Sequence, residues 1–249
     1  MPALTRRSFA AALAGGSLTA CMSAQSGGSS KTHLKARPGK SASGRDPGLH
    51  PLTLRQQRDS LLYIPKLPEP DKRAPLFVYL HGAGGSEQQG INRMRPFADE
   101  LGFLLLSPAS EGGTWDGIQE GYGPDVTMLD RALTKTFEAR LVDPSRIAIG
   151  GFSDGASYAL GLGLSNGDLF KSLLAFSPGF IPPGSKPAGK PRIFISHGTK
   201  DEILPIDSCS RRLVPELKRS GYNVNYREFD GPHTVPREIA DQAFRWFLD

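Results

Sequence analysis

Residues 146–156 read Arg-Ile-Ala-Ile-Gly-Gly-Phe-Ser-Asp-Gly-Ala, and this stretch decides the fold. The apolar run Ile147–Ile149 predicts a buried strand, and the small apolar residues of Ala156–Leu164 predict a helix packed close to a sheet. Between them stands the pattern G-x-S-x-G, which places a serine on a sharp strand-to-helix turn. Neighbouring glycines are needed because side chains there would collide with the sheet and the helix. We therefore predict Ser153 as a nucleophile at a helix N-terminus, where free N–H groups favour developing negative charge.

Other short apolar runs outline the rest of a sheet. Uninterrupted runs of this kind are typical of strands buried on both faces, and hence of a mostly parallel sheet. They lie at residues 60–65, 75–80, 102–107, 173–176, 192–196 and 224–229, and helical patterns lie at 126–141, 156–164 and 238–248. The alternation predicts an α/β three-layer sandwich over residues 52–249. Only Pro178–Pro191 separates two of the strands, so we expect no lid domain and an open site.

A serine hydroxyl needs a base to take its proton, and the base needs an acid to orient it. His233 lies after the last strand and before the last helix, and is the predicted base. His81 and His197 each precede a glycine directly after a strand, which is more typical of a structural turn. Asp201, on the loop that leaves the penultimate strand, is the predicted acid. Glu202 and Asp207 are its alternatives.

Residues 81–85, His-Gly-Ala-Gly-Gly, follow an early strand and allow backbone to approach a substrate closely. The backbone N–H groups of Ala83 and Asp154 are the predicted donors to an oxyanion. A phosphate-binding loop is the alternative, but the segment lacks both the lysine of the P-loop and the full G-x-G-x-x-G pattern.

Four segments together resemble a known superfamily. These segments are similar to α/β-hydrolases. They are Leu80–Gly85, Val142–Arg146 leading into Gly151–Gly155, His197–Pro205 and Gly231–His233. Within these they resemble most the phospholipase/carboxylesterase and polyhydroxybutyrate-depolymerase-like esterases, over roughly Leu52–Asp249. The chain order Ser153, Asp201, His233 is also the order of that superfamily. The resemblance implies a serine esterase that forms an acyl-enzyme on a small-molecule or polymeric ester, with no metal and no organic cofactor.

This sequence departs from the resemblance at two points. Asp154 stands where many relatives carry Gln, Ala or Met, and its carboxylate should disfavour anionic substrates or hold a polar group in the pocket. The disulfide cysteines of many secreted polymer esterases are absent as well. Residues Ser110–Pro124 are equally compatible with a pocket wall and with an exposed loop.

Three alternative functions remain beside a general carboxylesterase. One is a polysaccharide deacetylase or feruloyl-type esterase, and another is a serine peptidase, although such peptidases usually carry a further domain. The third is a non-catalytic surface lipoprotein. A complete triad argues against that last reading, because a binding module has no need of three matched residues.

The N-terminus predicts export and anchoring. Residues 1–20 have the organisation of a signal peptide, and Arg6-Arg7 resembles a twin-arginine signal. Leu18–Cys21 resembles a bacterial lipobox, which predicts lipidation of Cys21 and a protein held in the bacterial cell envelope. Residues 21–51, rich in Ser, Gly and Lys, are predicted to be a flexible basic tether. Cys209 is then the one other cysteine, and we expect it to be a buried or incidental thiol.

The net charge of +5 comes from residues 1–50 and not from the domain that follows them. Residues 1–50 hold seven basic residues and one acidic residue, which leaves 23 basic and 24 acidic residues for the remainder. A nearly neutral domain excludes nucleic-acid binding based on bulk charge. No segment approaches the roughly 18 apolar residues of a membrane-spanning helix.

Overall fold

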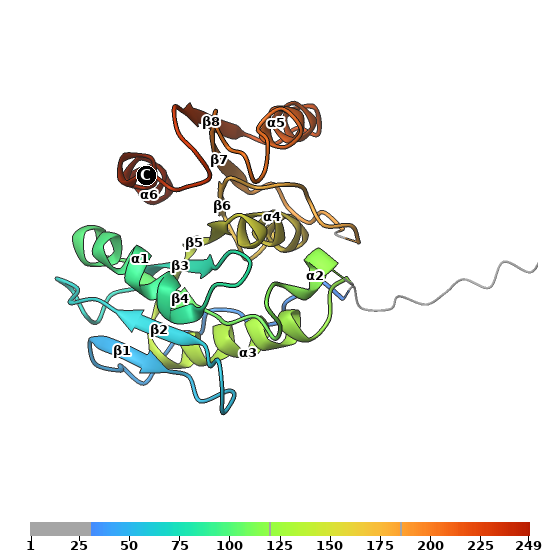
Figure 1. Ribbon diagram of the computed structural model, residues 1–249. Coiled ribbons are helices and arrows are strands. Elements are labelled where there is room, and N and C mark those ends of the chain that lie inside the picture. Colours follow the sequence, from blue (N-terminus) through green and yellow to red (C-terminus); the bar gives the residue numbers. More distant parts are fainter. Residues whose placement is uncertain (1–30, 120, 185) are drawn as a thin grey trace, which may run out of the picture.

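The computed structural model describes residues 31–119, 121–184 and 186–249, and within them eight strands form one sheet (Figure 1). The strand order is β1-β2-β4-β3-β5-β6-β7-β8. The pairs β1–β2 and β2–β4 are antiparallel, and the five other pairs are parallel. The strands are β1 Gly48–Pro51, β2 Leu61–Ile64, β3 Ala74–Leu80, β4 Leu104–Ser107, β5 Val142–Phe152, β6 Ser172–Phe176, β7 Arg192–Gly198 and β8 Val224–Phe229. The predicted, mostly parallel sheet is confirmed.

Helices cover both faces of the sheet, as Figure 1 shows. The helices are α1 Glu87–Leu101, α2 Asp116–Gln119, α3 Pro124–Ala139, α4 Asp154–Ser165, α5 Ser210–Arg219 and α6 Arg237–Leu248. One core contains residues of α3, α4 and α5, and a second core contains residues of α1 and α6. The molecule is therefore the predicted three-layer sandwich, and its strands β3, β4 and β6 are buried along their whole length because helices cover both faces.

Helix α1 is an element that the sequence reasoning missed. Its N-cap Ser86 accepts a hydrogen bond from the Gln89 N–H at 3.2 Å, and Gly102 ends it with a left-handed φ of 75°. Its buried face includes Ile91 and Met94. The capping serine, the apolar spacing and the terminal glycine were all readable in the sequence.

The segment before residue 52 differs from the predicted flexible tether. Leu34 is fully buried, and its N–H donates to Asn166 Oδ1 at 2.8 Å. The N–H groups of Lys35 and Ala36 both donate to Asp130 Oδ1, at 2.7 and 2.8 Å. Residues 48–51 then form β1, an edge strand of the sheet. The part of the tether that the structure describes, residues 31–51, thus belongs to the folded domain.

The predicted signal peptide, the lipidation site Cys21 and the start of the tether lie outside the described residues. Across the described ranges, no helix combines the length and the apolar character needed to span a bilayer. Residues 177–191, which link β6 and β7, contain no helix or strand in their described part. No lid domain is therefore inserted there.

Candidate active site

Ser153 lies on a strained turn between β5 and α4. Its backbone has φ 57° and ψ −122°, a conformation that costs a non-glycine residue about 1–3 kcal/mol. Its N–H donates to the Phe176 carbonyl of the neighbouring strand at 3.0 Å. A Cβ added at Gly151 or Gly155 would meet the Leu80 carbonyl oxygen at 2.5 or 2.2 Å. The predicted collision is confirmed, and both glycines are required for the close approach of β3 to this turn.

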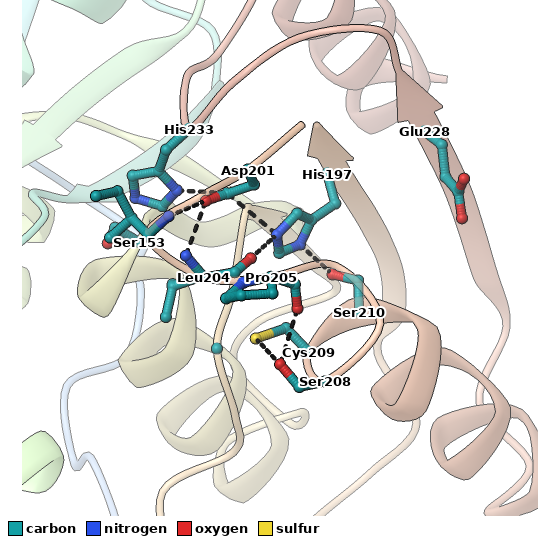
Figure 2. Close-up of polar contacts among 12 residues, drawn as sticks. Ser153, His197, Asp201, Leu204, Pro205, Ser208, Cys209, Ser210, Glu228 and His233 are labelled. Carbon is teal, nitrogen blue, oxygen red and sulfur yellow. Dashed lines mark hydrogen bonds and ion pairs between the residues drawn. The ribbon is translucent and has the colours of Figure 1, made fainter. Parts of the chain in front are cut away.

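Asp201 and His233 are held together at the same edge of the sheet, where β7 and β8 end. The Nδ1 atom of His233 lies 2.6 Å from Asp201 Oδ2, and Asp201 Oδ1 accepts the N–H groups of Ile203 and Leu204 (Figure 2). Burial raises the pKa of the Asp201 carboxyl, but the Leu204 N–H and the facing histidines His233 and His197 outweigh burial and hold the pKa below its ordinary value. Asp201 is therefore ionised, and the Nδ1–H tautomer of His233 leaves Nε2 free to accept a proton.

The imidazole of His233 is brought to the serine turn by the residue that precedes Ser153. The Phe152 ring packs on the His233 ring with 4.5 Å between centroids. Figure 2 draws Ser153 beside His233. The structure thus brings together the three side chains that the sequence predicted. The alternative acid Asp207 is instead exposed and pairs with Arg211 at 2.8 Å.

A second histidine contacts the acid from its other side. His197 is fully buried, and its Nε2 lies 2.8 Å from the Leu204 carbonyl and 3.2 Å from Asp201 Oδ2 (Figure 2). A carbonyl can only accept, so Nε2 carries the proton, and Nδ1 accepts from the Ser210 hydroxyl at 2.7 Å. The expected structural turn is present, but the sequence did not reveal that His197 also supports the Asp201 loop.

The glycine-rich loop after β3 uses part of its N–H groups in backbone hydrogen bonds. The Gly84 N–H donates to the Gly113 carbonyl at 2.7 Å, and the Gly85 N–H donates to Gly82 at 3.0 Å. The Ala83 N–H has no partner among the residues described by the structure. Asp154 is the first residue of α4, where N–H groups lack intrahelical acceptors. The N–H groups of Ala83 and Asp154 are therefore available as donors, and their role at an oxyanion stays a prediction.

Hydrogen bonds of His81 stabilise this glycine-rich loop. It is buried, its Nε2 accepts the Ser110 N–H at 3.2 Å, and its Nδ1 then donates to Gly82 at 2.8 Å. Burial lowers the pKa of His81 and keeps it neutral. The Trp115 indole donates to the His81 carbonyl at 2.8 Å. Arg58 ties two loops together through the carbonyls of Gly85 and Gly112, at 3.0 and 2.6 Å.

In its described part, the segment 110–124 therefore supports the glycine-rich loop 81–85, the candidate oxyanion loop. Trp115 is fully buried. It packs at a tilt against His81, with 4.9 Å between ring centroids, and stacks on Tyr158 at 5.2 Å. Thr114 donates its hydroxyl to Asp154 Oδ2 at 2.6 Å, so this carboxylate holds the supporting loop. Residue 120 lies outside the described set.

Across the described ranges, no three His, Cys, Asp or Glu side chains are grouped to hold a metal ion. Cys209 is buried, as expected, with Sγ 3.7 Å from the Ser208 hydroxyl. The residues at the sheet edge thus offer a hydroxyl, an imidazole, a carboxylate and backbone N–H donors.

A serine turn, an Asp–His pair and a glycine-rich donor loop on this sheet define an α/β-hydrolase. The family model described as "Phospholipase/Carboxylesterase" matches residues 118–243, half of the chain, and this range includes Ser153, Asp201 and His233. The chain belongs to the phospholipase/carboxylesterase family. The matched range begins after the loop that carries Ala83.

Individual relatives agree with this membership. The acetylxylan esterase of Coprinopsis cinerea is 32% identical over 225 residues, which cover 71% of this chain and 59% of that protein. The feruloyl esterase B of Thermothelomyces thermophilus is 29% identical over 125 residues, covering 47% of this chain and 42% of that protein. The chain thus spans about half the length of these relatives. The carboxylesterase structure from Bacillus cereus shares the fold, with a TM-score of 0.57 and 21% identity over 78% of this chain and 95% of that chain.

The buried histidines predict a loss of stability in mild acid. Burial lowers the pKa of both His81 and His197, so the unfolded chain binds more protons than the folded protein below about pH 6.5. The free energy of unfolding should therefore fall as the pH decreases through this value. We predict a shallower fall for His197→Asn than for the wild type, measured by urea unfolding at a series of pH values. His50→Asn, on the edge strand β1, is the matched control, and an unchanged slope in His197→Asn would contradict the assignment.

Proposed function

We propose that this protein is a serine carboxylic-ester hydrolase that acts through Ser153, His233 and Asp201. The observation that carries the proposal is the 2.6 Å contact between His233 Nδ1 and Asp201 Oδ2, at the sheet edge where the strained turn holds Ser153. Family membership and the esterase relatives support the same reaction class.

In the first half of the reaction, Ser153 Oγ attacks the ester carbonyl while His233 Nε2 takes the hydroxyl proton. Asp201 holds the imidazole in the required tautomer and stabilises its charged form. The N–H groups of Ala83 and Asp154 bind the oxyanion of the tetrahedral intermediate. As the carbon–oxygen bond to the alcohol breaks, His233 gives its proton to the departing oxygen and an acyl group remains on Ser153.

In the second half, His233 removes a proton from water, which attacks the acyl-enzyme. The oxyanion forms again at the same N–H donors. As it collapses, the bond from Ser153 Oγ to the acyl carbon breaks, His233 returns its proton to Oγ and the acid is released. Because Asp201 stays ionised, it takes no proton itself, and each proton passes through His233.

A second candidate is an esterase that removes acetyl or feruloyl groups from polysaccharide. Two relatives, named as an acetylxylan esterase and a feruloyl esterase B, favour it. The absence of an inserted domain between β6 and β7 in the described residues is compatible with an extended substrate. The next experiment would also detect a non-catalytic lipoprotein.

Triad variants test the proposal on 4-nitrophenyl and feruloyl esters. We predict that Ser153→Ala loses reaction with a fluorophosphonate label and loses hydrolysis. Asp201→Asn should lower kcat by about 10⁴-fold, because the imidazole loses its required tautomer. Rates are measured by release of the alcohol, and labelling by fluorescence of the denatured protein.

The matched control is Asp207→Asn, which removes an exposed carboxylate on the same loop and should leave kcat within about twofold. A label that persists in Ser153→Ala would refute the nucleophile. A wild-type protein that is inert to both ester classes and to the label would indicate a non-catalytic module.

We also propose that the protein is anchored in the bacterial cell envelope through lipid on Cys21. The support is the sequence alone, namely the signal-like residues 1–20 and the lipobox-like Leu18–Cys21. Since residues 31–51 pack on the domain, an anchor at Cys21 would leave only a short segment between the lipid and the first described residue.

We predict that Cys21→Ala moves the protein from the membrane fraction to the soluble fraction, measured by immunoblot after ultracentrifugation. Cys209→Ala is the control, since this buried thiol lies in the folded domain and should not affect fractionation. A Cys21→Ala protein that remains with the membrane would contradict lipid anchoring.

A further inference from the structure

A small cavity opens beside the nucleophile turn. Its volume is about 150 Å³, and its lining includes Gly82 and Ala83 of the oxyanion loop, Phe152 of the turn, and Gln89 and Arg93 of α1. A Cβ added at Gly82 would lie 3.3 Å from Ser153 Cβ, so the cavity wall reaches the nucleophile. A cavity of about 150 Å³ is large enough for a benzene-sized group.

The position of Phe152 indicates which part of an ester enters this cavity. One ring contact joins Phe152 to His233, with 4.5 Å between centroids. In the proposed reaction His233 delivers its proton to the departing alcohol oxygen, so that oxygen must lie near the imidazole. A cavity bounded by Phe152 therefore adjoins the alcohol side of the scissile bond.

Arg93 is the charged group on this cavity. Its Cζ lies 5.4 Å from the centroid of Phe152, on the ring that also contacts His233. Arg93 is exposed and forms no ion pair or hydrogen bond with any residue in the described ranges. Arg95, two residues further along α1, is occupied instead, since it pairs with Asp99 at 3.5 Å and lies over Tyr63.

We propose that this cavity is the alcohol subsite and that Arg93 selects esters whose alcohol part carries a carboxylate. The inference rests on the proposed esterase function and adds a substrate class to it. An arginine that forms no ion pair or hydrogen bond can bind a carboxylate through two parallel N–H donors, and Gln89 lines the same cavity. Asp154, whose charge should disfavour anions, does not line the cavity and accepts the Thr114 hydroxyl.

In the step concerned, the bond from Ser153 Oγ to the acyl carbon forms and the bond from that carbon to the alcohol oxygen breaks. The proton that His233 took from Ser153 passes to the alcohol oxygen. The product released from the cavity is a hydroxy acid with its carboxylate unchanged, and Arg93 takes no part in the proton transfers.

A pair of isosteric esters tests the subsite in the full-length protein. 4-Acetoxybenzoate and 4-acetoxybenzamide share the acetyl group and the aromatic ring, and differ in the charge of the distal group. We expect Arg93→Gln to lower kcat/KM for the benzoate about fivefold at low ionic strength and to change the benzamide less than twofold. Arg93→Lys, which keeps the charge, should recover part of the loss.

Arg95→Gln is the matched control, since it removes an equal charge from the same helix and should affect both esters alike. Equal effects of Arg93→Gln on the two esters, or no effect on either, would overturn the subsite while leaving the esterase function in place. A wild-type protein that cleaves the benzamide but not the benzoate would also overturn it. Failure of the wild type on both esters would instead count against the proposed function.

Discussion

The rest of the active site depends on the tight turn at Ser153. The turn exists because β3 approaches α4 so closely that no side chain fits at Gly151 or Gly155, where the Leu80 carbonyl oxygen would contact it. Ser153 itself accepts a φ of 57°, and the hydrogen bond of its N–H to Phe176 fixes that conformation. Parallel strands then place the loops after β7 and β8 at the same edge, where Asp201 and His233 meet.

Around this turn, several buried or half-buried polar side chains hold the loops through hydrogen bonds. His81 joins the oxyanion loop to Ser110, and Arg58 joins Gly85 to Gly112. On the other side of the site, His197 supports the Asp201 loop. Because a buried polar group left without a partner costs about 1–3 kcal/mol, these networks favour one arrangement of the loops. In the proposed mechanism, the arrangement of Ser153, Asp201 and His233 is thus prepared before any substrate binds.

The sequence predicted the elements whose signals are local. The buried strands are apolar throughout, and G-x-S-x-G identified the turn with its strand and helix. Helix α1 was missed although its signals were present, since Pro96 interrupts its pattern and its solvent face is strongly polar. The prediction of a flexible tether was wrong for residues 31–51, because their packing depends on partners far along the chain. One such partner is Asn166, which forms a hydrogen bond with Leu34 across 132 positions. Composition near Leu34 contains no information about a distant asparagine. The support that His197 gives to Asp201 is likewise a property of the folded loop.

The most direct test of the central claim compares Ser153→Gly with Ser153→Ala. Glycine at position 153 should relieve the strain of the turn because it has no Cβ. Alanine has a Cβ and should therefore keep the strain. We predict that both variants are inactive on 4-nitrophenyl acetate and that the glycine variant has the larger free energy of unfolding, by about 1 kcal/mol. A glycine variant of equal or lower stability, or one that retains hydrolysis, would contradict the claim that Ser153 is a strained catalytic nucleophile.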